Sequence, residues 1–154
     1  RGTPLKIGRG RILLEGTTVA ILGLGARVGA AIQAAEELAA MGLSTTVADA
    51  RFAKPLDIEL IKRLAREHEV MLIVEEGAAG GFSAHVMQCL ANSGDFDSGL
   101  KLRVLTMPDR FIDQEKPEIQ NDIAGLTAPH IVANILSALG REEEALALLE
   151  ARSA

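Results

Sequence analysis

The feature that most constrains this chain is the alternation of short apolar runs with helical patterns. Runs rich in Val, Ile, Leu and Ala predict buried strands over 17–22, 44–48, 70–74 and 102–106. Apolar residues at helical spacing predict helices between them, over 27–41, 58–67 and 82–91. Because strands and helices alternate, we expect a parallel sheet covered by helices on both faces.

Both ends of the chain add further elements. Residues 12–16 stand too close to the first parallel strand for a helical crossover, so we expect an antiparallel edge strand joined by a tight turn. Helices are predicted over 118–123, from Thr127 to Gly140, and over 142–150. The sequence thus predicts a three-layer α/β domain over 1–154 with a mostly parallel five-stranded sheet. Its parts include a link and edge strand (1–16) and a tail helix (141–154).

Composition limits the kinds of partner. The 154 residues fit one domain, and a formal net charge of −5 disfavours nucleic acid or anionic membrane as a partner, since both need a basic face. Cys89 is the only cysteine, which excludes an intrachain disulfide and suits a reducing cytosol. No apolar run reaches the roughly 18–20 residues of a transmembrane helix. The start at Arg1, without a methionine, indicates a fragment of a longer protein.

A glycine-rich turn follows the first parallel strand. Gly23, Gly25 and Gly29 lie where a dinucleotide-binding fingerprint would sit, and Asp49 lies about where its ribose-binding acid is expected. However, the spacing is G-x-G-x-x-x-G rather than G-x-G-x-x-G, and a lone glycine pattern is a weak signal. A tight strand-to-helix turn is therefore the favoured interpretation, with a nicotinamide-dinucleotide-binding domain as the alternative of another class.

Residues 49–57 are the most informative stretch. Arg51 and Lys54 follow the second parallel strand, at the sheet edge where open α/β sheets hold their ligands. An arginine fork can grip a phosphate or carboxylate bidentately, and Lys54 would add a mobile second charge. Arg51 could equally pair with Asp49 or with Asp57, which is the predicted N-cap of the next helix. Both interpretations stay open on physical grounds.

Two other polar groups lie at strand ends. Glu75 and Glu76 could serve as acid–base groups or metal ligands, but adjacent side chains diverge on a strand. We therefore favour acids that bond nearby backbone or an arginine. Arg110, after the fourth parallel strand, is a second cation at the same edge, with a surface or subunit-contact role favoured.

Histidine and cysteine show no catalytic spacing. His68 is expected on a solvated helix end, and His85 and His130 near helix starts. Cys89, inside a predicted helix, fits a core position better than a nucleophile. We therefore predict no catalytic residue, no cofactor-binding residue and no metal ligand in this chain.

Several ordered motifs resemble the 1-deoxy-D-xylulose-5-phosphate synthase family, a branch of the transketolase family. They are residues 49–57 (DARFAKPLD), 74–86 (VEEGAAGGFSAHV), 107–113 (MPDRFID) and 125–131 (GLTAPHI). Residues 1–10 resemble the link from a preceding domain, and the resemblance continues to about residue 147. The chain departs from the family at Ser83 and Ala84, where Gly and Ser are common, and at Glu115-Lys116.

The resemblance implies a transketolase carboxyl-terminal domain and a parent transferase that condenses pyruvate with D-glyceraldehyde 3-phosphate. The products are 1-deoxy-D-xylulose 5-phosphate and CO2, which feed isoprenoid and thiamine biosynthesis. It also implies thiamine diphosphate and Mg²⁺ in the full-length enzyme, held between other domains. The G-D-G motif of that site is absent from this chain, so the fragment alone should bind neither cofactor and be inactive.

The resemblance also assigns residues and partners. Arg51 matches the family arginine that helps to hold the phosphate of glyceraldehyde 3-phosphate, with Lys54 and Arg110 as secondary candidates. The implied partners are the preceding thiamine-binding domains of the same chain and a second copy in a homodimer, without nucleic acid or membrane. The implied location is the cytoplasm, or the plastid for a plant-type source. A 2-oxoacid dehydrogenase beta subunit or a transketolase is the alternative within the family, and a dimerisation module is another role.

Overall fold

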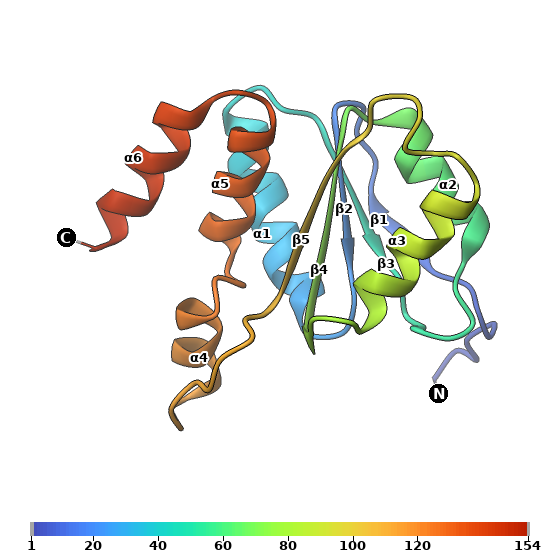
Figure 1. The fold of residues 1–154 in the computed structure, drawn as a ribbon, viewed down its shortest axis with the longest axis horizontal. Coiled ribbons are helices and arrows are strands. Elements are labelled where there is room, and N and C mark those ends of the chain that lie inside the picture. The colour runs from blue at the N-terminus through green and yellow to red at the C-terminus, as the bar shows by residue number, and fades with distance from the viewer. Residues whose placement is uncertain (1, 154) are drawn as a thin grey trace.

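The alternating apolar runs form the predicted sheet in the computed structural model, which describes residues 2–153 (Figure 1). Its strand order is β1-β3-β2-β4-β5. The strands are β1 (Arg11–Leu14), β2 (Val19–Gly23), β3 (Thr45–Asp49), β4 (Val70–Ala78) and β5 (Lys101–Met107). The helices are α1 (Arg27–Ala40), α2 (Ile58–Glu67), α3 (Phe82–Asn92), α4 (Pro117–Ile123), α5 (Ala128–Ala138) and α6 (Glu142–Ser153).

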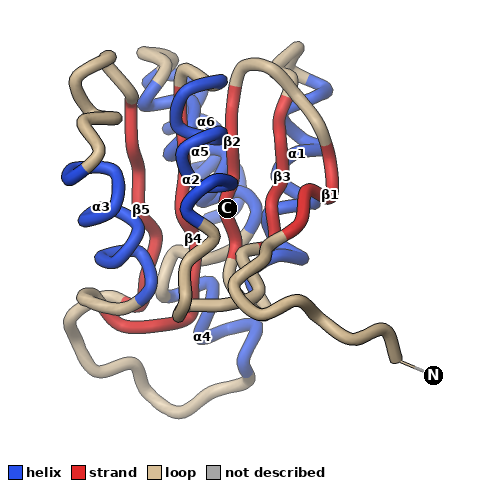
Figure 2. Tube along the Cα trace, turned by 90° about the vertical axis from the view of Figure 1, so that its right-hand side faces the viewer, coloured by secondary structure: helices blue, strands red, loops and turns tan. Residues whose placement is uncertain are grey.

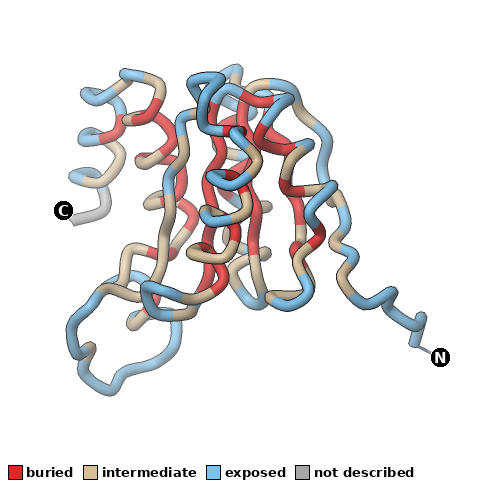
Figure 3. Tube along the Cα trace, turned by 45° about the vertical axis from the view of Figure 1, so that its right-hand side comes forward, coloured by how far each residue is buried: buried red, intermediate tan, exposed pale blue. Residues whose placement is uncertain are grey.

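Two hydrophobic cores flank the sheet because successive strand side chains point to opposite faces. In β4, Leu72 and Val74 face the core shared with α1 and α5, whereas Met71 and Ile73 face the core shared with α2 and α3. The burial colouring shows the central strands enclosed from both sides (Figure 3). The three-layer α/β prediction is confirmed.

The tail helix α6 belongs to one of these layers. It packs beside α5, where Ala145 is buried and Leu148 and Leu149 lie against the core (Figure 1). The helix extends beyond the predicted 142–150 and ends at Ser153. None of the helices within residues 2–153 is long and apolar enough to cross a membrane.

The antiparallel edge strand is confirmed, but its neighbour differs from the one that a tight turn would give. β1 pairs with β3 and not with β2, the next strand in the chain. β2 already pairs with β3 on one side and β4 on the other, so its hydrogen-bonding groups are taken. The connection instead passes beside β3 at Gly16, where a Cβ atom would lie 2.4 Å from the backbone of Thr45.

Strand β4 is longer than predicted, because it continues through the first glycine of the expected turn to Ala78. Its pairing with β5 becomes irregular between Val74 and Ala78. The added residues place Glu75 and Glu76 at the carboxyl edge of the sheet, where Glu75 is still buried and Glu76 is exposed.

The prediction for His68 is wrong. Its ring is buried, with Nδ1 3.0 Å from Leu64 O and Nε2 2.7 Å from Thr46 Oγ1. Thr46 Oγ1 also accepts a hydrogen bond from Gly16 N at 2.8 Å and lies 3.0 Å from Gly16 O. Helix α2, strand β3 and the β1–β2 turn are therefore joined by one buried polar cluster, which a sequence pattern cannot show.

We predict that Thr46→Val destabilises the chain by about 1–3 kcal/mol, because the isosteric change leaves the Gly16 N–H and the His68 ring without their shared partner. Urea denaturation measures the free energy of unfolding. Thr17→Val, on the exposed turn nearby, is the matched control and should change stability little. Equal effects of the two substitutions would contradict the importance of the cluster.

Candidate functional site

The loops that follow the parallel strands gather at one edge of the sheet, the lower edge in Figures 1 and 2. Arg51 follows β3, Glu75 and Glu76 end β4, and Arg110 follows β5. Carboxyl ends of parallel strands are the usual location of ligands in open α/β sheets. This edge is therefore the candidate site.

The carboxylates nearest to Arg51 in sequence are already bound elsewhere. Asp49 accepts from Arg11 Nε at 3.1 Å, and its other oxygen accepts from the backbone N–H of Arg51 at 3.0 Å. Asp57 caps α2 through Leu60 N at 3.2 Å and pairs with Arg9 at 3.2 Å. Neither carboxylate forms an ion pair with the Arg51 guanidinium, so the ion-pair alternative for Arg51 is wrong.

The Arg51 side chain is half-buried and makes no ion pair with any residue that the structure describes. A partly desolvated cation without a protein anion favours binding of an anionic ligand. The chemistry available here is therefore charge-assisted hydrogen bonding to a phosphate or carboxylate group.

The backbone of Arg51 is itself unusual. Its φ is 59°, in the left-handed region that L side chains rarely adopt. The hydrogen bond from its N–H to Asp49 Oδ1 helps to hold this conformation. Strained backbone at a ligand edge is typical of functional positions, where the fold retains an unfavourable conformation to aim a side chain.

We predict that Arg51→Gly is more stable than Arg51→Ala by about 1 kcal/mol, since both remove the guanidinium but only glycine adopts this φ freely. Chemical denaturation of the two variants side by side measures the difference. If alanine is as stable as glycine, the backbone is not strained in solution.

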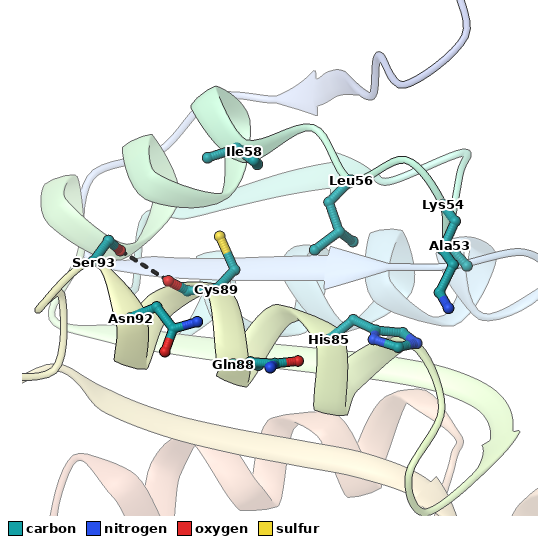
Figure 4. Close-up of a pocket in the computed structure, with 9 residues that line it drawn as sticks. All are labelled: Ala53, Lys54, Leu56, Ile58, His85, Gln88, Cys89, Asn92 and Ser93. Carbon is teal, nitrogen blue, oxygen red and sulfur yellow. Dashed lines mark hydrogen bonds between the residues drawn. The ribbon is translucent and has the colours of Figure 1, made fainter.

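The other predicted cations lie apart from Arg51. Lys54 is exposed and borders a groove of about 450 Å³ between α3 and the start of α2 (Figure 4). Arg110 is exposed and donates to Ile123 O at 3.3 Å. Since β2 and β4 lie between β3 and β5, the ends of these two strands stand about 14 Å apart, and Arg51 and Arg110 follow strands that are not neighbours.

Glu75 and Glu76 diverge, as expected for neighbours on a strand. Glu75 is buried and accepts from Phe82 N at 3.2 Å and Ser83 N at 2.9 Å, which caps the amino end of α3. Glu76 pairs with Arg27 at 2.9 Å. The interpretation of these acids as partners of backbone and arginine is confirmed.

The Gly23–Gly29 turn is explained by local geometry. Gly25 has a φ of 67°, and a Cβ atom on Gly23 would lie 3.2 Å from Val28 Cα. Space around Gly29 is open, so it does not provide the close helix–strand packing of a dinucleotide fingerprint. Asp49 is also engaged by Arg11 and by the Arg51 N–H. These observations support the tight-turn interpretation.

Sequence reasoning missed Arg27, which connects distant segments. Its guanidinium bonds Glu76 on β4 and donates to Leu126 O at 3.3 Å. A signal was available, because a cation in the first turn of a helix opposes the helix dipole and therefore implies a tertiary partner. Asn121, which donates to Glu76 Oε1 at 3.3 Å, gave no such signal.

The remaining candidates fit structural roles. His85 and Cys89 border the groove in Figure 4. The core position expected for Cys89 is therefore wrong, because the residue is only partly buried and belongs to neither hydrophobic core. His130 lies near the start of α5, as expected, with Nδ1 2.7 Å from Thr127 Oγ1. Thr127 occupies the predicted N-cap position, but its side chain makes no capping bond to the helix backbone. Within residues 2–153, no group of three or more His, Cys, Asp and Glu side chains is placed to hold a metal ion.

Burial raises the pKa of the Cys89 thiol, and Lys62 only partly offsets this. The group therefore stays protonated to higher pH in the folded chain than in the unfolded chain. We predict that the pH midpoint for alkylation by iodoacetamide is higher in buffer than in concentrated urea. A lower midpoint in the folded chain would indicate an activated thiol instead.

Comparison with known proteins decides the family. Residues 8–131 match the family described as transketolase, C-terminal domain. The chain belongs to the transketolase C-terminal domain family. A similar solved structure is that of a split-gene transketolase, described as an inactive beta4 tetramer, with a TM-score of 0.77 and 29% sequence identity. The alignment covers 91% of this chain and 45% of that one, so this chain spans less than half the length of that transketolase chain.

These matches confirm the resemblance to the transketolase family and the fold that it implied. The synthase branch and the role of Arg51 stay predictions. In this transketolase C-terminal domain, the groove in Figure 4 and the Arg51 edge are separate features, because Arg51 does not line the groove.

Proposed function

We propose that this chain is the carboxyl-terminal domain of a thiamine-diphosphate-dependent transferase of the 1-deoxy-D-xylulose-5-phosphate synthase type. In this role Arg51 binds the phosphate of D-glyceraldehyde 3-phosphate. The observation that carries the proposal is the half-buried Arg51 guanidinium, which has no ion-pair partner among the described residues and lies at the ligand edge of the sheet. Membership of the transketolase C-terminal domain family supports the enzyme class.

The local structure suits a positioning role. The Arg51 N–H donates to Asp49, and Asp57 fixes the start of α2 on the other side of the loop. With both carboxylates occupied, the guanidinium is available to a phosphate that arrives from outside this chain. It would hold the substrate at its phosphate end and leave the carbonyl end facing the cofactor.

The cofactor would be held by other parts of the enzyme. The described residues contain no suitable cluster of metal ligands, and the sequence lacks a G-D-G motif. When bound in the full enzyme, thiamine diphosphate would supply the carbanion chemistry, with Mg²⁺ anchoring its diphosphate. The isolated chain would therefore bind the substrate phosphate weakly and form no product.

Transketolase is the second candidate, because the similar solved structure carries that name. Both candidates use phosphorylated sugars, so Arg51 would have the same role in each. They differ in the donor, which is pyruvate for the synthase and a ketose phosphate for transketolase. A 2-oxoacid dehydrogenase beta subunit would use a 2-oxoacid without a phosphorylated acceptor. That structure is described as a tetramer, which supports a further role of this domain in subunit contacts. For the intact enzyme that contains this chain we propose a homodimer.

In the intact enzyme that contains this chain, Arg51→Ala should raise KM for glyceraldehyde 3-phosphate about 10- to 150-fold and leave KM for pyruvate nearly unchanged. The reason is the loss of a charge-assisted phosphate contact, of about 1.5–3 kcal/mol. Steady-state kinetics with each substrate varied in turn measures the effect.

Arg103→Ala is the matched control, because Arg103 is exposed and, among the described residues, donates only to the neighbouring Leu102 O. It should leave both KM values unchanged. Unaltered aldehyde kinetics in Arg51→Ala would refute the phosphate-binding role, and turnover of a ketose phosphate without pyruvate would favour transketolase.

A further inference from the structure

The groove in Figure 4 is not used by the proposed function. It has a volume of about 450 Å³ and lies between α3 and the residues that lead into α2 (Figure 4). Arg51 does not line it. Cavities of about 300–1,000 Å³ are the size at which proteins bind small molecules. The groove is therefore large enough for a separate ligand site.

One side of the groove is apolar. Ala53 and Leu56 belong to the loop before α2, and Ile58 is the first residue of that helix. Ile58 is 50% exposed, although burial of an aliphatic side chain is favourable. From the other side, the sulfur of Cys89 points away from α3 toward α2 (Figure 4). An apolar ligand in the groove would remove these surfaces from water.

The other side of the groove follows one face of α3. His85, Gln88, Cys89 and Asn92 are spaced as i, i+3, i+4 and i+7, which places them in one row along the helix. From His85 to Asn92 the helix rises about 10 Å, at 1.5 Å per residue. The groove therefore suits an elongated ligand of about that length.

The charge of the groove favours an anion. Lys54 and His85 lie at one end and Asn92 lies toward the other (Figure 4). Lys54 forms no ion pair with any residue that the structure describes. None of the described lining residues is acidic, although the chain contains 21 Asp and Glu residues. Asp95, just beyond the groove, is buried and paired with Arg66 at 2.6 Å. A negative group is therefore attracted to the Lys54 end.

We propose that this groove binds a small amphipathic carboxylate, with its apolar chain along α3 and its carboxylate at Lys54. The His85 ring, at the same end, supplies a further N–H donor. One lysine matches one negative charge, so a singly charged head group fits better than a diphosphate. A medium-chain fatty acid has this chemistry. The site is separate from the phosphate-binding role proposed for Arg51.

The probe is decanoate, added to the 154-residue chain below its micelle concentration. Isothermal titration calorimetry should show saturable binding of one decanoate per chain. Decyltrimethylammonium has the same apolar chain and a positive head group, so it should bind about 5-fold more weakly or less.

Cys89 reports whether the ligand lies in the groove. It is the only cysteine in the chain, so iodoacetamide labels this position alone. Decanoate at ten times its Kd should slow the alkylation of Cys89 about tenfold, because a bound chain covers the sulfur in all but about a tenth of the molecules.

Ile58→Glu should abolish both the binding and the protection of Cys89, because it replaces an apolar wall with a like charge. The fold should be retained, since a negative charge in the first turn stabilises a helix. Ile119→Glu is the matched control, because Ile119 is also exposed and lies in the first turn of α4. It should retain binding and protection. Lys54→Gln should weaken decanoate about 2- to 5-fold without weakening decyltrimethylammonium.

The absence of saturable decanoate binding, with unchanged alkylation of Cys89, would overturn the proposal and favour a polypeptide segment as the occupant of the groove. Equal losses in Ile58→Glu and Ile119→Glu would overturn it as well, because decanoate would then bind elsewhere.

Discussion

The pairing of β2 with β3 on one side and β4 on the other is the constraint on which the rest of the structure depends. These strands are buried on both faces, so each must supply apolar side chains in both directions. The pairing also determines which edges remain. β1 can join only beside β3, and β5 closes the opposite side next to β4. The loops that follow the parallel strands consequently lie at one edge of the sheet. The polar residues at the strand ends are thereby brought to that edge, where a ligand could contact them.

Tertiary hydrogen bonds organise that edge. Asp49 and Asp57 bind the basic amino-terminal segment and the backbone of the 49–57 loop, and Glu75 binds the first turn of α3. Each of these carboxylates is thereby used structurally. Among the described residues, neither Arg51 nor Lys54 of this loop has an ion-pair partner, and Arg51 is the more buried of the two. The phosphate-binding proposal thus follows from how neighbouring charges are paired as well as from the position of one arginine.

Much of the fold could be predicted because the relevant signals are local. Helix α2 has its predicted bounds, since Asp57 caps it and its apolar face repeats at helical spacing. The partner of β1, the extension of β4 and the burial of His68 could not be predicted, because they depend on segments far apart in sequence. The same applies to the site. The sequence predicted that Arg51 follows the end of a strand. It could not predict that two strands lie between the strand before Arg51 and the strand before Arg110, because the pattern of apolar residues does not specify the strand order.

The left-handed backbone of Arg51 has an evolutionary consequence. If stability were the only property under selection, glycine or asparagine would be favoured over arginine at this position, because both adopt the left-handed conformation more readily. Retaining arginine requires a selective pressure that exceeds the conformational penalty. If Arg51 binds a phosphorylated substrate as proposed, a lineage that no longer uses such a substrate should lose this arginine early, while the Asp57 cap, which serves the fold, should persist.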